Sequence, residues 1–327
     1  MLLENKITKV PDFSLKMEIN RWCDYIELIC LTCKDEIITK DDIISLILEE
    51  HNDSGEEEHS NNYDKISADV ERVFEHIRYR SEAIDEFYPY NYESGCLALK
   101  NNFSEENIQY IILLLCSSIV FMDKSSSTIT TKYFEEYCLQ IFRYFVSKDS
   151  EVYVFGTSRE NKKFVGNLRT RIELLAKCFN SETTKTFDND QQFDVSAGDE
   201  GIDLVAFNHI DEASHIPIAL GQCTCSYLKW EIKQEEINQD AWTQKIMPIA
   251  PFGKYMFVSF FCRNASGKFE NPTTITTCLI DRLRILLTIR RHNEILENIN
   301  VLNQISLIKK CAGDELVKRI DDRLDDC

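Results

Sequence analysis

Gly201-Ile202-Asp203-Leu204-Val205-Ala206-Phe207 and Ile218-Ala219-Leu220-Gly221-Gln222-Cys223-Thr224 are the two stretches that decide the fold of this chain. Both are rich in aliphatic residues and are bounded by Gly or Pro, which is typical of buried strands. A third run, 255–262, has the same character. Helical spacing of apolar residues precedes these runs at 167–179 and follows them at 281–320. The second half of the chain therefore predicts a unit that mixes helices and strands.

The first half of the chain differs, because its apolar residues follow helical spacing throughout. Helices are predicted over 15–50 (as a hairpin), 64–86, 107–122 and 132–146, with a polar loop at 51–63. The character changes near residue 150, where a short strand is predicted at 152–156. We therefore expect an α+β protein. An all-helical domain would cover 1–150, and a three-layer α/β domain with a mixed sheet and C-terminal helices would cover 151–327.

Charge restricts the classes of function. The chain of 327 residues holds 37 Lys and Arg against 55 Asp and Glu, a formal net charge of −18. Such a charge argues against a free-standing, nonspecific DNA-binding protein, because the phosphate backbone would repel it, but it leaves open a nuclease with a local basic groove or a basic partner subunit. Acidic residues concentrate in 35–58, where the only base is Lys40. This segment is either a solvated surface or a docking face for a basic protein partner, so we expect any regulatory contact in the N-terminal half.

Cellular location is predicted from what the sequence lacks. The first residues have no apolar core of a signal peptide, and the longest apolar run, 110–121, is shorter than the roughly 20 residues that span a bilayer. The 13 cysteines are odd in number and scattered, which favours reduced thiols. We expect a cytoplasmic protein without membrane contact, and the sequence leaves its oligomeric state open.

The order of polar residues around the two apolar stretches indicates metal chemistry. Asp203 begins one strand and Gln222 lies in the next, so a carboxylate and an amide oxygen come from neighbouring elements. Hard oxygen ligands of this kind suit Mg²⁺ or Mn²⁺, which acidifies a water and neutralises phosphate charge. Glu173 in the preceding helix, or Asp199 in the loop before Asp203, would add an acid. Asp199 is equally well a loop cap.

Over roughly 165–262 the chain resembles the PD-(D/E)XK nuclease superfamily, in the variant that has Gln in place of the second acid. The resemblance implies a restriction-endonuclease-like fold and metal-dependent cleavage of DNA, with bacterial antiviral defence as a setting. The chain is also similar to uncharacterised bacterial proteins with a helical N-terminal region. That similarity is carried by 22–28 (Trp-Cys-Asp-Tyr-Ile-Glu-Leu), Tyr88-Pro89-Tyr90, Val154-Phe155-Gly156, Gly221-Gln222-Cys223 and the Trp230-x-x-Lys233 pair.

One position departs from the superfamily pattern. The lysine expected two residues after Gln222 is Thr224. Lys233 or Lys229 would have to supply the ammonium beside the attacking water, and the Trp230-x-x-Lys233 pair favours Lys233. If neither lysine reaches the site, the alternative is a non-catalytic subunit that uses a degenerate nuclease fold to dock protein or nucleic acid. RNA instead of DNA as the substrate also stays open.

A basic segment supplies candidates for nucleic-acid contact. Between 282 and 310 there are six bases and two acids. Arg282, Arg290 and Arg291 could contact phosphates, and Trp230 could stack on a base. The competing interpretations are a helix balanced by neighbouring acids and, for Trp230, packing in the core.

Overall fold

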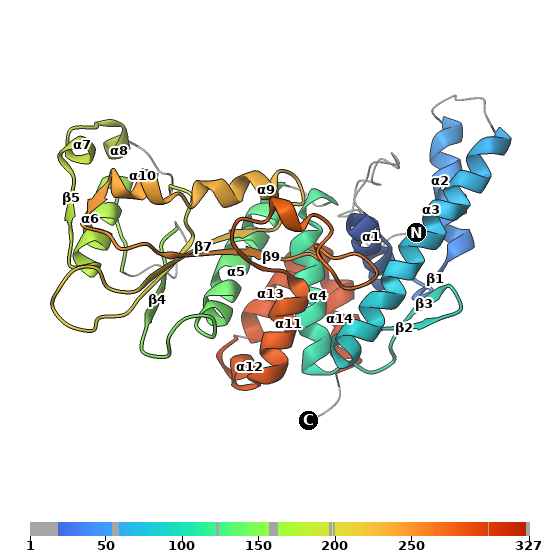
Figure 1. Ribbon diagram of the computed structural model, residues 1–327. Coiled ribbons are helices and arrows are strands. Elements are labelled where there is room, and N and C mark those ends of the chain that lie inside the picture. Colours follow the sequence, from blue (N-terminus) through green and yellow to red (C-terminus); the bar gives the residue numbers. More distant parts are fainter. Residues whose placement is uncertain are drawn as a thin grey trace.

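The structure is a computed structural model that describes residues 19–53, 59–121, 124–156, 163–195, 198, 200–299 and 301–324. It is a mixed α+β protein with 53% helix and 16% strand. The molecule is elongated: a sheet occupies one end, a helical hairpin the other, and packed helices lie between them (Figure 1). In the described part of the chain, no helix combines the length and apolar character needed to cross a bilayer.

A five-stranded sheet forms one end of the molecule, in the order β10-β9-β7-β6-β4. Its strands are β4 (Glu151–Val154), β6 (Leu204–Phe207), β7 (Ile218–Thr224), β9 (Gly253–Val258) and β10 (Cys278–Ile280). The first three pair antiparallel, whereas β9 runs parallel to β7 and β10 parallel to β9. The predicted mixed sheet is therefore confirmed, with β10 as a strand that the sequence did not predict.

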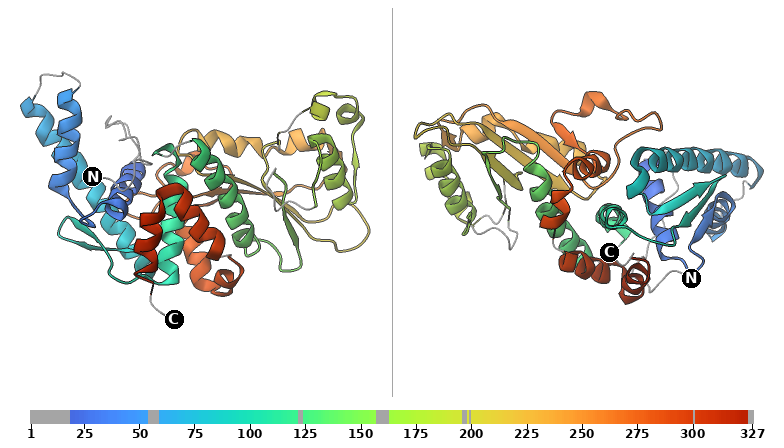
Figure 2. Two further views of the ribbon diagram at one scale, coloured as in Figure 1. Left: turned by 180° about the vertical axis from the view of Figure 1, so that it is seen from behind. Right: turned by 90° about the horizontal axis from the view of Figure 1, so that it is seen from below.

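Helices cover both faces of this sheet, because successive side chains of a strand point to opposite faces. On one face, Leu204 and Cys223 belong to the core that contains α5 (Lys124–Phe142). On the other, Val205 and Leu220 pack with α6 (Leu168–Cys178). Figure 2 shows α5 and α6 on either side of the strands. The second face is completed by shorter helices, α9 (Trp230–Lys233), η3 (Gln234–Glu236) and α10 (Gln239–Thr243).

Smaller elements complete this end of the molecule. A two-stranded ribbon and two single-turn helices lie beyond α6: β5 (Glu182–Thr183), β8 (Ile246–Met247), α7 (Lys185–Asp188) and α8 (Gln192–Val195). They extend the molecule away from the packed helices (Figure 1). The loop after β9 carries η4 (Pro272–Thr274) and leads into β10.

The N-terminal half is not all-helical, so that prediction is wrong. Its helices are α1 (Ile19–Thr32), α2 (Lys40–Asp53), α3 (His59–Ile84) and α4 (Glu105–Ser117), with η1 (Asp85–Phe87) and η2 (Ile119–Phe121). They surround an antiparallel sheet in the order β1-β3-β2, with β1 (Ile37–Thr39), β2 (Tyr90–Glu93) and β3 (Cys96–Leu99). Ser94 and Gly95, both at positive φ, form the two-residue turn between β2 and β3, as tight hairpins require. Strands of three or four residues leave too short a pattern to predict.

The C-terminal helices pack against the N-terminal half. They are α11 (Arg282–Arg291), α12 (Glu294–Asn298), α13 (Val301–Ala312) and α14 (Asp314–Asp321). Gln304 donates to Gln109 on α4 at 3.2 Å, and Arg319 donates to the Leu31 carbonyl of α1 at 2.9 Å. One hydrophobic core contains residues of both halves of the chain. Residue 150 therefore does not separate two independent cores.

Candidate functional site

Asp203 lies in the bend before β6, where β4, β6 and β7 meet. Its backbone N–H donates to the Gly221 carbonyl at 2.9 Å, and its carbonyl accepts from the Phe155 N–H at 2.7 Å. The carboxylate oxygen Oδ2 accepts from the Cys223 N–H at 2.7 Å. With only 6% of its surface exposed, Asp203 is held at the end of the sheet by both neighbouring strands.

Gln222 lies beside Asp203 on β7. The antiparallel register pairs Leu204 with Gly221, and its continuation by one residue puts Asp203 opposite Gln222. The Gln222 amide nitrogen donates to Oε2 of Glu236 at 2.7 Å. Its oxygen Oε1 is buried and has no hydrogen-bond partner among the described residues, which costs about 1–3 kcal/mol unless a ligand or a water occupies it. The two residues that the sequence selected are thus together, and one presents an unused oxygen.

Glu135 of α5 brings a second carboxylate to this place. A Cβ built on Gly156 would lie 3.5 Å from Oδ1 of Asp203 and 3.5 Å from Oε2 of Glu135. The two carboxylates therefore converge on one glycine, at the end of β4. Glu135 lies in the helix predicted over 132–146, where the apolar spacing indicates a buried element and does not mark an acid as a site residue. The available signal was an acid at position 135 in that apolar helix.

Of the two other acids proposed from the sequence, only Glu173 lies among the described residues. Glu173 is half-buried on α6 and makes no hydrogen bond or ion pair within the described part of the chain. Its role as the auxiliary acid stays a prediction, and Glu135 is a second candidate for that role. Asp199 lies outside the described residues.

The candidate lysines lie on the segment between Gln222 and Glu236. Lys229 is exposed, at φ 59°, directly before α9, and Lys233 is half-buried at the end of that helix. Neither forms an ion pair with a carboxylate among the described residues. Thr224 is buried and its hydroxyl accepts from the Ser226 N–H at 3.2 Å. It therefore stabilises the turn after β7 and supplies no ammonium.

The donor set suits a hard cation. Asp203, Glu135 and the free amide oxygen of Gln222 are oxygen donors of the kind that Mg²⁺ and Mn²⁺ prefer, and Mg²⁺ commonly keeps several waters in addition. Over the residues described, His, Cys, Asp and Glu do not gather in groups of three that could hold a metal ion. A cation here would therefore depend on the amide oxygen and on water as well as on the two acids.

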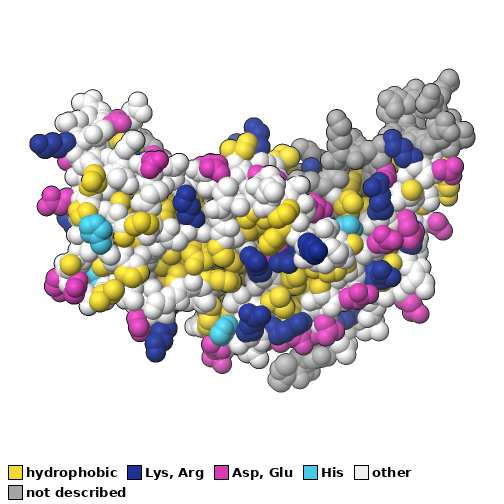
Figure 3. All heavy atoms as spheres, viewed as in Figure 1, with side chains coloured by type: hydrophobic (Ala, Val, Ile, Leu, Met, Phe, Trp, Pro, Cys, Tyr) yellow, Lys and Arg dark blue, Asp and Glu magenta, His cyan; other side chains and the backbone are white. Residues whose placement is uncertain are grey.

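Two of the predicted nucleic-acid contacts are wrong. Arg282 is fully buried, and Trp230 is 7% exposed and packs edge-on against Phe260. Arg290 donates to Glu86 at 2.7 Å, whereas Arg291 is exposed. Lys and Arg side chains do gather over α11 in Figure 3. We still predict phosphate contact for Arg291 on this face. For Arg290 we predict a weaker contact, because Glu86 already engages its side chain.

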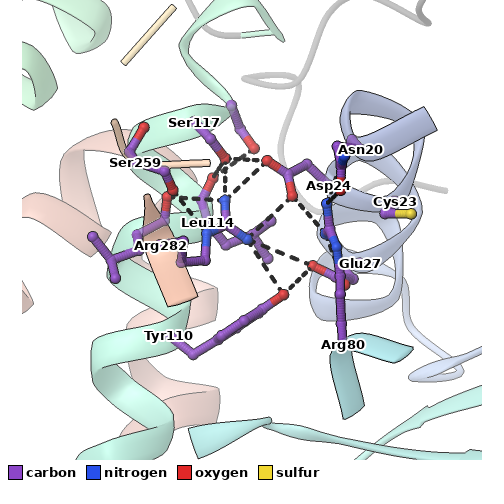
Figure 4. Close-up of polar contacts among 12 residues, drawn as sticks. Asn20, Cys23, Asp24, Glu27, Arg80, Tyr110, Leu114, Ser117, Ser259 and Arg282 are labelled. Carbon is purple, nitrogen blue, oxygen red and sulfur yellow. Dashed lines mark hydrogen bonds and ion pairs between the residues drawn. The ribbon is translucent and has the colours of Figure 1, made fainter. Parts of the chain in front are cut away.

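Arg282 belongs to a second polar cluster, between α1, α3, α4 and α11 (Figure 4). We call this cluster the buried charge network; its charged members are Asp24, Glu27, Arg80 and Arg282, all at most 1% exposed. Arg282 donates to both oxygens of Asp24, at 3.1 and 2.9 Å. Arg80 donates to Asp24 at 2.7 Å and to Glu27 at 3.0 Å. Two guanidinium groups therefore balance two carboxylates.

Neutral donors complete the buried charge network. The hydroxyls of Tyr88 and Tyr110 donate to Glu27 at 3.0 and 2.6 Å, and Tyr227 donates to Asp24 at 2.9 Å. Although burial alone would raise it, the pKa of Asp24 is held below its ordinary value by Arg282 and Arg80. Every carboxylate oxygen of this network accepts a hydrogen bond, so it offers no free ligand position.

Comparison with protein-family models, with curated proteins and with solved structures finds no match.

Proposed function

We propose that this chain is a metal-dependent nuclease that hydrolyses DNA phosphodiester bonds, and that Asp203 and Gln222 hold its metal ion. The observation that carries the proposal is the buried, unpartnered Oε1 of Gln222 opposite the fixed carboxylate of Asp203. The mixed sheet and the order of Asp203, directly before β6, and Gln222, on β7, support the resemblance to the PD-(D/E)XK superfamily.

Electrostatics supports the need for a cation. Asp203, Glu135 and Glu236 bring carboxylates to one end of the sheet, and a phosphodiester near them would be repelled. Mg²⁺ or Mn²⁺, when bound, supplies charge neutralisation and a more acidic water. Asp203 would hold the cation with a side chain that the Cys223 N–H orients, and Gln222 would add its amide oxygen. Lys233 would approach from α9 to stabilise charge on the phosphate.

The test is a cleavage assay on plasmid DNA and single-stranded RNA with Mg²⁺ or Mn²⁺. Wild type should cut DNA only with metal, and Asp203→Asn should not. Asp211→Asn removes an exposed acid from the loop between β6 and β7 and serves as the matched control. Cleavage of RNA alone would change the substrate, and equal cleavage by wild type and Asp203→Asn would refute the site.

A second candidate is a non-catalytic docking subunit. It is favoured by Thr224, whose hydroxyl stabilises a turn at the position where the superfamily has lysine. In this case the wild-type protein would bind nucleic acid or protein without cleaving any substrate in either metal. A basic partner would meet the acidic α2–α3 end, which projects from the molecule in Figure 1.

A further inference from the structure

Glu236 is the immediate neighbour of Gln222 on the side away from its free oxygen. Its Oε2 accepts from the Gln222 amide nitrogen at 2.7 Å. Its chain is pressed against the loop before β6: a Cβ built on Gly201 would lie 2.4 Å from the Cβ of Glu236. Gly201 has φ +73°, so a glycine there permits both the backbone conformation and this close approach.

The chemistry of Glu236 decides which way the amide faces. An ionised carboxylate only accepts hydrogen bonds, so the Gln222 nitrogen must face it and the oxygen must face the other way. A glutamate at position 222 would instead put two carboxylates at hydrogen-bond distance, where like charges disfavour each other. The same contact therefore orients the amide and disfavours an acid at this position.

We propose that Glu236 is a positioning residue that directs Oε1 of Gln222 to the cation, and that it is the reason position 222 carries Gln instead of an acid. This inference rests on the proposed metal site. Outer-shell partners of this kind commonly contribute 10- to 100-fold to metal affinity.

The first measurement is Mn²⁺ affinity of the full chain by isothermal titration calorimetry, with urea unfolding as the check on folding. Glu236→Ala should weaken Mn²⁺ binding at least about tenfold. Glu236→Gln keeps an acceptor for the Gln222 amide and should stay within about threefold of wild type. Glu235→Ala removes the neighbouring charge, whose carboxylate contacts Thr276 instead, and is the matched control.

A charge swap gives the sharper test. Gln222→Glu adds a negative charge beside Glu236, whereas Gln222→Glu with Glu236→Gln keeps the wild-type charge and restores a donor–acceptor pair. If pairing governs the site, the double variant binds Mn²⁺ more tightly than Gln222→Glu does. If net charge alone governs it, the single variant binds more tightly and the inference is overturned.

The outcomes separate the inference from the proposed function. Wild type that binds Mn²⁺, with Glu236→Ala and Glu235→Ala equally close to wild type, overturns the role of Glu236 and leaves the metal site intact. Equal weakening by Glu236→Ala and Glu236→Gln shows a charge effect and also overturns it. Wild type that binds no Mn²⁺ overturns the proposed site and the inference together.

Discussion

The buried charge network and the Asp203–Gln222 site both place charged side chains in the protein interior. They differ in whether every side-chain oxygen accepts a hydrogen bond. In the network, every oxygen of Asp24 and Glu27 accepts a hydrogen bond from an arginine, tyrosine or serine. At the site, Gln222 keeps a buried oxygen without a partner. Paired carboxylates stabilise a fold, whereas an unpaired buried acceptor costs stability and is open to a ligand or a water. The contrast separates a structural cluster from a functional candidate.

The largest effect should come from breaking the network. Arg282→Met removes one guanidinium and leaves Asp24 without half of its compensating charge, so the free energy of unfolding should fall by about 3–5 kcal/mol. Urea denaturation followed by circular dichroism measures this. Arg291→Met changes an exposed arginine of the same helix and should have little effect. Adding Asp24→Asn to Arg282→Met should restore part of the loss, and no recovery would mean that charge balance is not the cause.

At the Asp203–Gln222 site we expect a large loss of activity with little loss of stability. Asp203→Asn should lower metal-dependent cleavage at least about 100-fold, beyond what an outer-shell residue contributes. Its free energy of unfolding should stay within about 1 kcal/mol of wild type, because the amide still accepts from the Cys223 N–H. Cleavage rates and urea curves on the same preparation provide both values. A large loss of stability in Asp203→Asn would show that Asp203 has a structural role, as the residues of the buried charge network do.

A smaller effect is expected from the auxiliary acids. It compares Glu135, which the structure indicates, with Glu173, which the sequence indicated. Glu135→Gln should reduce cleavage about tenfold, as loss of an auxiliary metal contact would. Glu173→Gln should leave it unchanged, since Glu173 makes no polar contact in the described chain. The pair is compared at saturating Mg²⁺ on one plasmid substrate. Loss of activity in Glu173→Gln alone would restore the original assignment.

The smallest effect concerns the basic face over α11. Arg291→Ala, made in cleavage-deficient Asp203→Asn, should weaken DNA binding and reduce the salt dependence of log K by about one unit per lost phosphate contact. Fluorescence anisotropy at several salt concentrations measures this. Arg290→Ala should change the slope less, because Glu86 already engages Arg290. An unchanged slope in Arg291→Ala would move the DNA path to another face.

The sequence predicted what depends on local pattern. The apolar runs of β6 and β7 and the helical spacing of α6 were sufficient to place those elements, and therefore Asp203 and Gln222, next to each other. The start of α2 is equally local, since Thr39 and Asp42 exchange hydrogen bonds at 2.8 and 3.2 Å. Each of these features involves residues close in sequence or a strong apolar period.

What the sequence did not predict depends on contacts between distant residues. Arg282 was predicted to contact phosphates at the surface. Its charge alone does not reveal that it is buried and paired with Asp24, which lies far away in the chain. Glu135 was hidden in a core helix, since only the packing of α5 on the sheet brings it to Gly156. The motifs at 22–28 and 88–90 carry a resemblance to other proteins but do not reveal a role. The structure shows that their polar residues Asp24, Glu27 and Tyr88 belong to the buried charge network.

The pairing of Asp24 with Arg282 spans 258 residues, and this has a consequence during synthesis. At roughly 5–20 residues per second, a ribosome needs about 10 to 50 s to add Arg282 after Asp24. During that interval the first helix carries two carboxylates that cannot yet be neutralised as in the finished protein. The N-terminal half is therefore expected to complete its folding only after α11 has emerged from the ribosome, and to depend on chaperones until then.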